Sequence, residues 1–160
     1  MIIVCDSSPL IALSTIDSLC LLDGLFKDVF VPLSVFNELT VDNKPEAARI
    51  SDWSLDKIVS TTNLQLMHSF NLMLDMGESE AMALYFEKNA DFLLIDEKKG
   101  RKIATYNKIN VVGSLGILLM SKQKGLISSI KPLLNRLQQS NIRISDALYL
   151  KTLELAGETS

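Results

Sequence analysis

Two aspartates stand directly after short apolar segments of the chain. Asp6 follows residues 2–5 and Asp96 follows residues 92–95. Short uninterrupted apolar runs are typical of strands that are buried on both faces of a parallel sheet. Ligands of such sheets bind at the carboxyl ends of the strands. We therefore expect Asp6 and Asp96 to share one site at that edge, although either aspartate alone is also explained as the cap of a following helix.

Two glutamates in predicted helices can join these aspartates. Glu38 lies beside apolar positions in a helix that starts at Pro32, and Glu80 lies near the start of a helix over residues 78–88. Clustered carboxylates repel one another unless a cation neutralises them. Ligands that are all oxygen favour a hard ion, Mg²⁺ or Mn²⁺. Such an ion can activate water and orient a phosphodiester, so the predicted chemistry is phosphodiester hydrolysis.

Glu78 and Glu97 are the neighbouring acids that need a separate interpretation. Glu78 precedes Glu80 in the same predicted helix, where a negative charge near the amino end is favourable without any function. Glu97 either reaches the metal or decorates the first turn of the helix after Asp96, and we favour the second. Neither glutamate is therefore included in the predicted site.

A basic segment follows Asp96. Lys98, Lys99, Arg101 and Lys102 crowd the first turns of the predicted helix. Cations at a helix amino end oppose the helix dipole, so helix stability does not explain them. A nucleic-acid phosphate arriving at the metal would, and these four residues are the candidate RNA phosphate contacts. The alternative is a solvated basic face with Glu97 as its partner.

Composition narrows the class of protein. The chain has 160 residues, 48% apolar and 22% charged, with a net charge of −3, which fits one globular domain over residues 1–160 without a generally basic surface. No apolar run approaches the ~20 residues that span a bilayer, so we expect a cytoplasmic protein with no membrane contact. One histidine and two cysteines, without a CxxC motif, argue against zinc and disulfide frameworks.

Predicted strands alternate with predicted helices along the chain. The strands are residues 2–5, 29–31, 92–95, 110–112 and 142–144, and residues 57–61 are a further extended segment. Residues 63–76 have the apolar spacing of one helix, which we expect Gly77 to end. This alternation predicts an α/β fold in three layers, with a mostly parallel central sheet of four to five strands and helices on both faces.

Several short motifs in this order resemble the PIN-domain superfamily, in particular a prokaryotic PIN-like branch of poorly defined function. They are Asp6-Ser7-Ser8-Pro9-Leu10-Ile11, Pro32-x-x-Val35-x-x-Glu38-Leu39, Gly77-Glu78-x-Glu80-Ala81 and Leu94-Ile95-Asp96-Glu97. Two later motifs, Gly113-Ser114-Leu115-Gly116 and Lys122-x-x-Gly125-x-Ile127-x-x-x-Lys131-Pro132, also resemble that branch. The resemblance therefore extends over almost the whole chain.

The resemblance implies an acidic pocket that binds Mg²⁺ or Mn²⁺ and endoribonuclease activity on RNA. Many members are VapC-type toxins, which a small antitoxin protein neutralises and which often form homodimers. The residues that match the acidic positions are Asp6, Glu38, Glu80 and Asp96 as catalytic residues, with Asp6, Glu80 and Asp96 as metal ligands and Ser7 or Ser8 as supporting hydroxyls. Gly113 and Ser114 stand where many members carry a further Asp or Asn, so we expect one metal position rather than two.

Two alternatives to a nuclease remain open. The missing later acid is compatible with a catalytically weak or inactive PIN-like module that holds RNA or a protein partner. Receiver and phosphatase domains also place aspartates at strand ends, but no DxD motif or paired acid follows the first predicted strand here.

Overall fold

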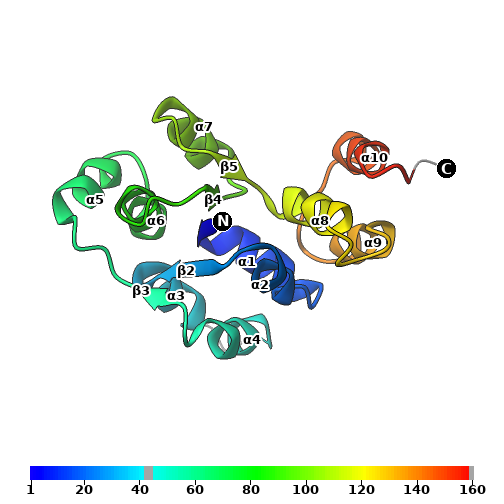
Figure 1. Ribbon diagram of the computed structural model, residues 1–160, viewed down its shortest axis with the longest axis horizontal. Helices are drawn as coiled ribbons and strands as arrows, with labels where there is room; N and C mark the ends of the chain where they lie inside the picture. Colours follow the sequence, from blue (N-terminus) through cyan, green and yellow to red (C-terminus); the bar gives the residue numbers. More distant parts are fainter. Residues whose placement is uncertain (42–44, 159–160) are drawn as a thin grey trace.

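A five-stranded sheet, parallel throughout, forms the middle layer of the molecule in the computed structural model, which describes residues 1–41 and 45–158 (Figure 1). The strand order is β3-β2-β1-β4-β5. The strands are β1 (Ile2–Cys5), β2 (Asp28–Pro32), β3 (Ile58–Val59), β4 (Phe92–Leu94) and β5 (Val111–Val112). Because the chain winds outward from β1 in one direction and then returns to add β4 on the other side, the switch point of the sheet lies between β1 and β4.

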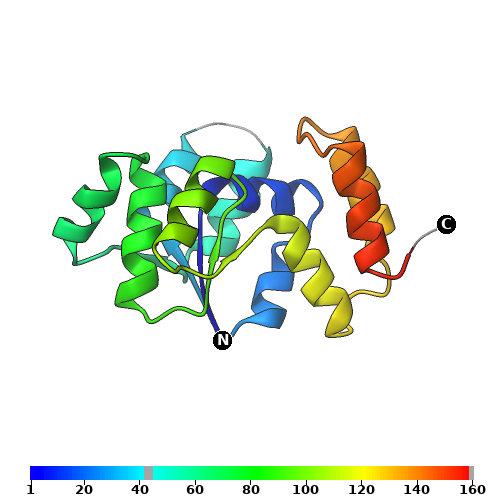
Figure 2. The same ribbon diagram turned by 90° about the horizontal axis from the view of Figure 1, so that it is seen from above.

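Ten helices flank this sheet within the described residues (Figures 1 and 2). They are α1 (Ser7–Thr15), α2 (Cys20–Leu25), α3 (Leu33–Thr40), α4 (Pro45–Ser54), α5 (Leu64–Asn71), α6 (Met76–Glu87), α7 (Lys98–Tyr106), α8 (Ser114–Gln123), α9 (Lys131–Gln139) and α10 (Asp146–Leu155). Both views place α5 at one end of the molecule and α9 and α10 at the other. Among the described helices there is none long and apolar enough to cross a membrane.

Alternation along β1 divides the apolar core between the two faces of the sheet. Ile3 and Cys5 pack into a large cluster with α1, α2 and α8, whereas Val4 packs into a second cluster with α6 and α7. All three side chains are fully buried. Successive side chains of a strand point to opposite faces, so a continuous apolar run requires helices on both sides. The three-layer α/β fold predicted from the sequence is confirmed.

Two local predictions were wrong. Residues 142–144 do not form a strand, because Ile142 and Ile144 pack against the core from the connection between α9 and α10 instead of pairing with the sheet. Gly77 does not end a helix either, since it lies in the first turn of α6. The helix predicted over residues 63–76 ends at Asn71 as α5, and α6 begins at Met76.

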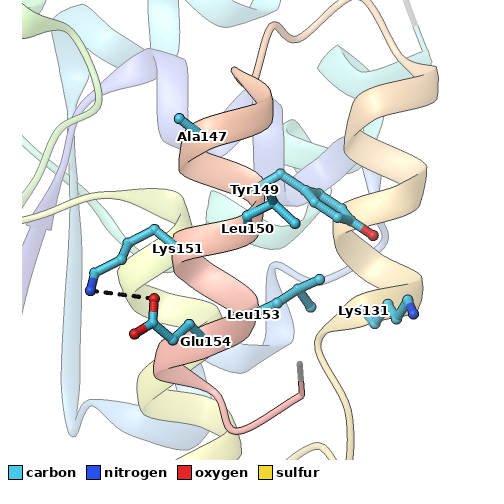
Figure 3. Close-up of a pocket in the computed structure, with 7 residues that line it drawn as sticks. All are labelled: Lys131, Ala147, Tyr149, Leu150, Lys151, Leu153 and Glu154. Atoms are coloured by element: carbon cyan, nitrogen blue, oxygen red, sulfur yellow. Dashed lines mark ion pairs between the residues drawn. The ribbon is translucent and has the colours of Figure 1, made fainter. Parts of the chain in front are cut away.

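Helices α9 and α10 lie side by side and carry an open pocket of about 610 Å³ on their surface (Figure 3). Tyr149 and Leu153 extend from α10 toward α9, and the Tyr149 hydroxyl donates a hydrogen bond to Asn135 Oδ1 at 2.6 Å. Lys151 and Glu154 point the other way and form an exposed ion pair of 3.6 Å. The pair of helices is therefore joined mainly by apolar contact along one side of α10.

Glu158 ties the segment after α10 to the junction between α8 and α9. Its carboxylate accepts hydrogen bonds from Lys122 Nζ (2.7 Å), Ser129 Oγ (2.7 Å) and the backbone amides of Ile130 (2.7 Å) and Lys131 (3.0 Å). Although burial opposes the charge, these donors lower the pKa of Glu158 to about 2. The charged form is therefore the one that stabilises the fold.

We predict that Glu158→Gln destabilises the protein by about 2 kcal/mol at pH 7, the order of magnitude for hydrogen bonds to a charged group. Because the pKa is lowered on folding, this stabilisation is present above the usual glutamate value and is lost as the pH falls toward 2. Urea unfolding at pH 7 and at pH 3 measures both effects. Glu154→Gln, which removes only an exposed ion pair, is the control and should cost under ~0.5 kcal/mol.

Candidate active site

Asp6 is a buried carboxylate at the carboxyl end of the central strand. Its backbone amide continues the ladder between β1 and β4 by donating to the Leu94 carbonyl at 2.9 Å. The residue occupies the N-cap position of α1, but its side chain makes no capping hydrogen bond. It is only 2% exposed, and its Oδ1 atom has no hydrogen-bond partner among the described residues. A buried oxygen without a partner is costly, so a structural cap does not explain this aspartate.

Glu38 approaches Asp6 from α3. The Ser7 hydroxyl donates to Glu38 Oε1 at 3.5 Å, which links the glutamate to the residue next to Asp6. The other oxygen lies over the first turn of α6, where a Cβ atom on Gly77 would be 3.0 Å from Glu38 Oε2 and 3.2 Å from Val35. Absence of a side chain at residue 77 therefore lets α3 and α6 pack closely, and it brings the Glu38 carboxylate to the positive end of α6.

The first turn of α6 supplies two more carboxylates, Asp75 and Glu78. Asp75 is the N-cap residue, and its Oδ1 accepts the Glu78 amide at 2.8 Å. The half-buried Glu78 has its pKa raised to about 7, first by burial and then by the charges of Asp75, Glu97 and Glu38. Five acids from four separate segments thus act on one another at this edge of the sheet.

The same charges perturb Asp6. Burial raises its pKa most, the backbone amide of Ser7 opposes this, and the charges of Glu78, Asp75 and Glu38 raise it further, to about 7. Burial and the Asp75 charge also raise the pKa of Glu38. Burial among other acids thus raises the pKa of three carboxyls, of which Asp6 and Glu78 reach about 7, and such clustered shifts are typical of a cation site.

Glu80 was predicted to be a metal ligand, and the structure places it elsewhere. Its carboxylate accepts the amides of Ser34 at 2.8 Å and Thr61 at 3.2 Å, and the residue is 5% exposed. Glu80 therefore fastens α6 to the start of α3 and to the segment after β3. Residues two apart on a helix point about 200° apart, so Glu78 and Glu80 cannot both face Asp6.

Asp96 does lie at the same edge as Asp6, at the end of the neighbouring strand β4, but both of its oxygens have partners. Oδ1 accepts the Ser114 amide at 2.8 Å and Oδ2 accepts the Ser114 hydroxyl at 2.8 Å. A Cβ atom on Gly113 would lie 2.6 Å from Asp96 Oδ1, so this approach requires glycine. The exposed Asp96 thus satisfies donors at the amino end of α8, 18 residues away along the chain.

The remaining predicted residues divide between the site and other roles. Ser7 contacts Glu38, whereas Ser8 is exposed and makes no side-chain hydrogen bond among the described residues. Arg101 is half-buried and donates to the Ile95 carbonyl at 2.9 Å, while Lys98, Lys99 and Lys102 are exposed. Glu97 is the N-cap of α7, as the preferred interpretation of it predicted, and its charge also reaches Glu78.

Sequence reasoning missed Asp75 and Glu78. The segment Asp75-Met76-Gly77-Glu78 has the spacing of a capping box, in which an N-cap acid is followed three residues later by Glu. That spacing would have moved the predicted start of the helix from Glu78 back to Asp75. Glu78 then falls in the first turn, over the edge of the sheet.

A divalent metal fits the chemistry of these residues. The donors are carboxylate oxygens without a histidine or a cysteine among them, and the unpartnered Oδ1 of Asp6 is a buried acceptor for a cation. Within residues 1–41 and 45–158, however, no three such side chains are already close enough to hold an ion. Mutual repulsion of the carboxylates opposes their approach until a cation is present. Asp6, Glu38 and Glu78 are the residues that would hold it.

We predict that Glu78→Gln and Glu80→Gln have opposite effects. The first should lower Mn²⁺ affinity roughly tenfold or more, since even outer-shell changes commonly cost that much, and should leave stability unchanged or higher. The second should lower stability by about 1 kcal/mol, because one buried amide loses its acceptor, and should spare affinity. Calorimetric titration and urea unfolding separate them. Loss of Mn²⁺ binding in Glu80→Gln alone would contradict this assignment.

Protonation of the buried Asp6 carboxyl makes the stability of the protein depend on pH. Asp6 has a pKa that rises on folding to about 7, so its contribution to stability is fully present below pH 4 and is lost as the pH rises through 7. In EDTA, stability should therefore fall between pH 5 and pH 8, and Mg²⁺ or Mn²⁺ should restore it at pH 8. Asp6→Asn should be more stable than the wild type by roughly 1–3 kcal/mol at pH 8 in EDTA. The stability of this variant should not rise when metal is added. A difference in stability between the two proteins that does not change with pH would contradict the raised pKa of Asp6.

Comparison with known proteins agrees with this architecture. A family model described as PIN domain matches residues 2–158, which is almost the entire chain. Searches of curated proteins and of solved structures gave no significant match. The five-stranded parallel sheet, the flanking helices and the acidic edge at the end of β1 are the features that the match covers. The chain belongs to the PIN-domain family.

Proposed function

We propose that this protein is a metal-dependent endoribonuclease that hydrolyses RNA phosphodiesters at the acidic edge of its sheet. The observation that carries the proposal is Asp6, a buried carboxylate with an unpartnered oxygen and a pKa raised to about 7 among further acids. PIN domains are generally nucleases that use divalent metals, so membership of the family supports the same reaction class.

The proposed mechanism assigns different roles to the carboxylates. Asp6, Glu38 and Glu78 would hold Mg²⁺ or Mn²⁺, and a bound ion of this kind supplies charge neutralisation and a more acidic water. Ser7 keeps Glu38 oriented through its hydroxyl, and Glu80 keeps α6 in register with α3.

RNA is favoured as the substrate by the cations beside the site. Lys98 and Lys99 are exposed in the first turn of α7, immediately after the strand end that carries Asp96 and Glu97. Neither lysine forms an ion pair within the described residues. Their charges at the amino end of a helix are unfavourable for the helix itself, and a polyanionic strand would compensate them.

A second candidate function is a PIN-like module that binds RNA or a protein without cleaving it. Asp96 favours this alternative, because both of its oxygens already accept hydrogen bonds from Ser114 and a cation would have to compete with these bonds. Under this alternative the acids at the edge of the sheet bind cations weakly and do not support cleavage. The role as a toxin, the small antitoxin and the homodimer remain predictions from the resemblance.

We predict that the purified protein cleaves single-stranded RNA in Mn²⁺ or Mg²⁺ and that EDTA abolishes cleavage. Asp6→Asn should lower the rate by at least ~100-fold, because it removes the charge that anchors the ion. Gel analysis of a labelled RNA measures both effects, and Asp17→Asn, which alters an exposed acid paired with Arg49 and Arg136, is the matched control.

Cleavage that persists in EDTA or in Asp6→Asn would contradict the metal mechanism. RNA binding without cleavage in Mn²⁺ or Mg²⁺, at any pH between 6 and 9, would instead establish the binding module.

A further inference from the structure

A groove of about 870 Å³ lies between α5 and α7, on the face of the molecule that carries α6. Its apolar lining comes from Leu66, Phe70 and Met73 on one side and Ile103 and Tyr106 on the other. Two of these side chains are strongly exposed, Met73 at 60% and Tyr106 at 88%. Apolar side chains left open to water along a groove indicate a surface that receives a ligand.

The charges that border this groove are all positive. Lys99 and Lys102 line it, no carboxylate does, and neither lysine forms an ion pair within the described part of the chain. Lys99, Lys102 and Tyr106 are spaced three and four residues apart, so they form one stripe about 10 Å long on a single face of α7. The groove therefore suits an occupant that combines negative charge with flat apolar surfaces.

The residues that line the groove lie close along the chain to the acids at the edge of the sheet. Met73 stands two residues before Asp75, the N-cap of α6, and Lys99 stands two residues after Glu97, the N-cap of α7. The charges of Asp75 and Glu97 both act on Glu78. A strand with one phosphodiester at Asp6 and Glu78 would thus pass between these two helix ends and enter the groove.

We propose that this groove is a subsite for the stretch of single-stranded RNA adjoining the cleaved phosphodiester. Its bases lie against Tyr106 and Met73, and its phosphates contact Lys99 and Lys102. The inference rests on the proposed ribonuclease function and adds how the substrate is held. Alternating phosphates and bases match the stripe of lysines and tyrosine, because single-strand binding combines a cationic track with aromatic stacking.

The first test uses fluorescence. The chain contains one tryptophan, Trp53 on α4, outside the groove, so Tyr106→Trp adds a reporter at the site against a known background. With Asp6→Asn to prevent cleavage, a titration with an eight-nucleotide RNA should quench the new signal and leave the wild-type Trp53 signal unchanged. Tyr106→Leu, which keeps an apolar side chain without a ring, should weaken RNA binding about tenfold, whereas Tyr106→Phe should bind as the wild type does.

The second test uses charge. The double variant Lys99→Ala, Lys102→Ala should lower the slope of log affinity against log salt by about 1.4, since each phosphate contact on a single strand contributes about 0.7. Lys27→Ala is the matched control, because Lys27 is exposed at the amino end of β2, the opposite edge of the sheet, and should leave the slope unchanged. Anisotropy of a labelled octanucleotide measures each slope, and circular dichroism verifies that each variant is folded.

Different results would contradict the RNA subsite and the ribonuclease function. Unquenched fluorescence in Tyr106→Trp, together with equal RNA affinity in Tyr106→Leu and the wild type, would overturn the subsite even if the protein cleaves RNA; the groove would then belong to a polypeptide. Quenching and a lowered salt slope in a protein that never cleaves RNA would support RNA binding in the groove and refute the nuclease. A dinucleotide substrate too short to enter the groove should be cleaved equally by the wild type and Tyr106→Leu.

Discussion

Burial of the Asp6 carboxylate at the end of β1 is the constraint on which the rest of the site depends. Its position is not adjustable, because the backbone of Asp6 continues the hydrogen-bond ladder to β4 and the residue begins α1. An ionised carboxylate buried in such a place is unfavourable, because the apolar core offers it no opposite charge. Burial raises the pKa of Asp6 to about 7, so the neutral carboxyl is favoured below that pH. A bound cation would instead stabilise the charged form.

Helix α6 organises the other carboxylates around this fixed point. The charges of its N-cap acid and of Glu78 act on Asp6, and the missing side chain of Gly77 leaves room for Glu38. Glu80 accepts the amides of Ser34 and Thr61 instead. The first turn of this helix, and not a loop, therefore positions the acids around Asp6, although no three of the described side chains are yet close enough to hold an ion. Helix α6 can contribute Glu78 to the acidic edge and use Glu80 as a structural acceptor, because residues two apart on a helix point in nearly opposite directions.

Much of the fold was predictable from the sequence, because buried parallel strands have uninterrupted apolar runs and the helices between them begin at recognisable residues. The positions of Asp6 after a buried strand and of Glu38 within a helix were also predictable, whereas their role in a metal site stays a prediction. The choice between Glu78 and Glu80 was not predictable from apolar periodicity, because that choice depends on where α6 begins, within one or two residues. The partners of Asp96 were likewise out of reach, since Ser114 is 18 residues away in the chain and meets it only through the pairing of β4 with β5.

The hydrogen bonds between Asp96 and Ser114 have a thermodynamic consequence. Any cation that recruited Asp96 would compete with the amino end of α8 for the same two oxygens, so its apparent affinity would include the cost of uncapping that helix, on the order of 1 kcal/mol. Helix α8 packs against both α2 and α10. A cation that recruited Asp96 would therefore also loosen the start of a helix that contacts α2 and α10.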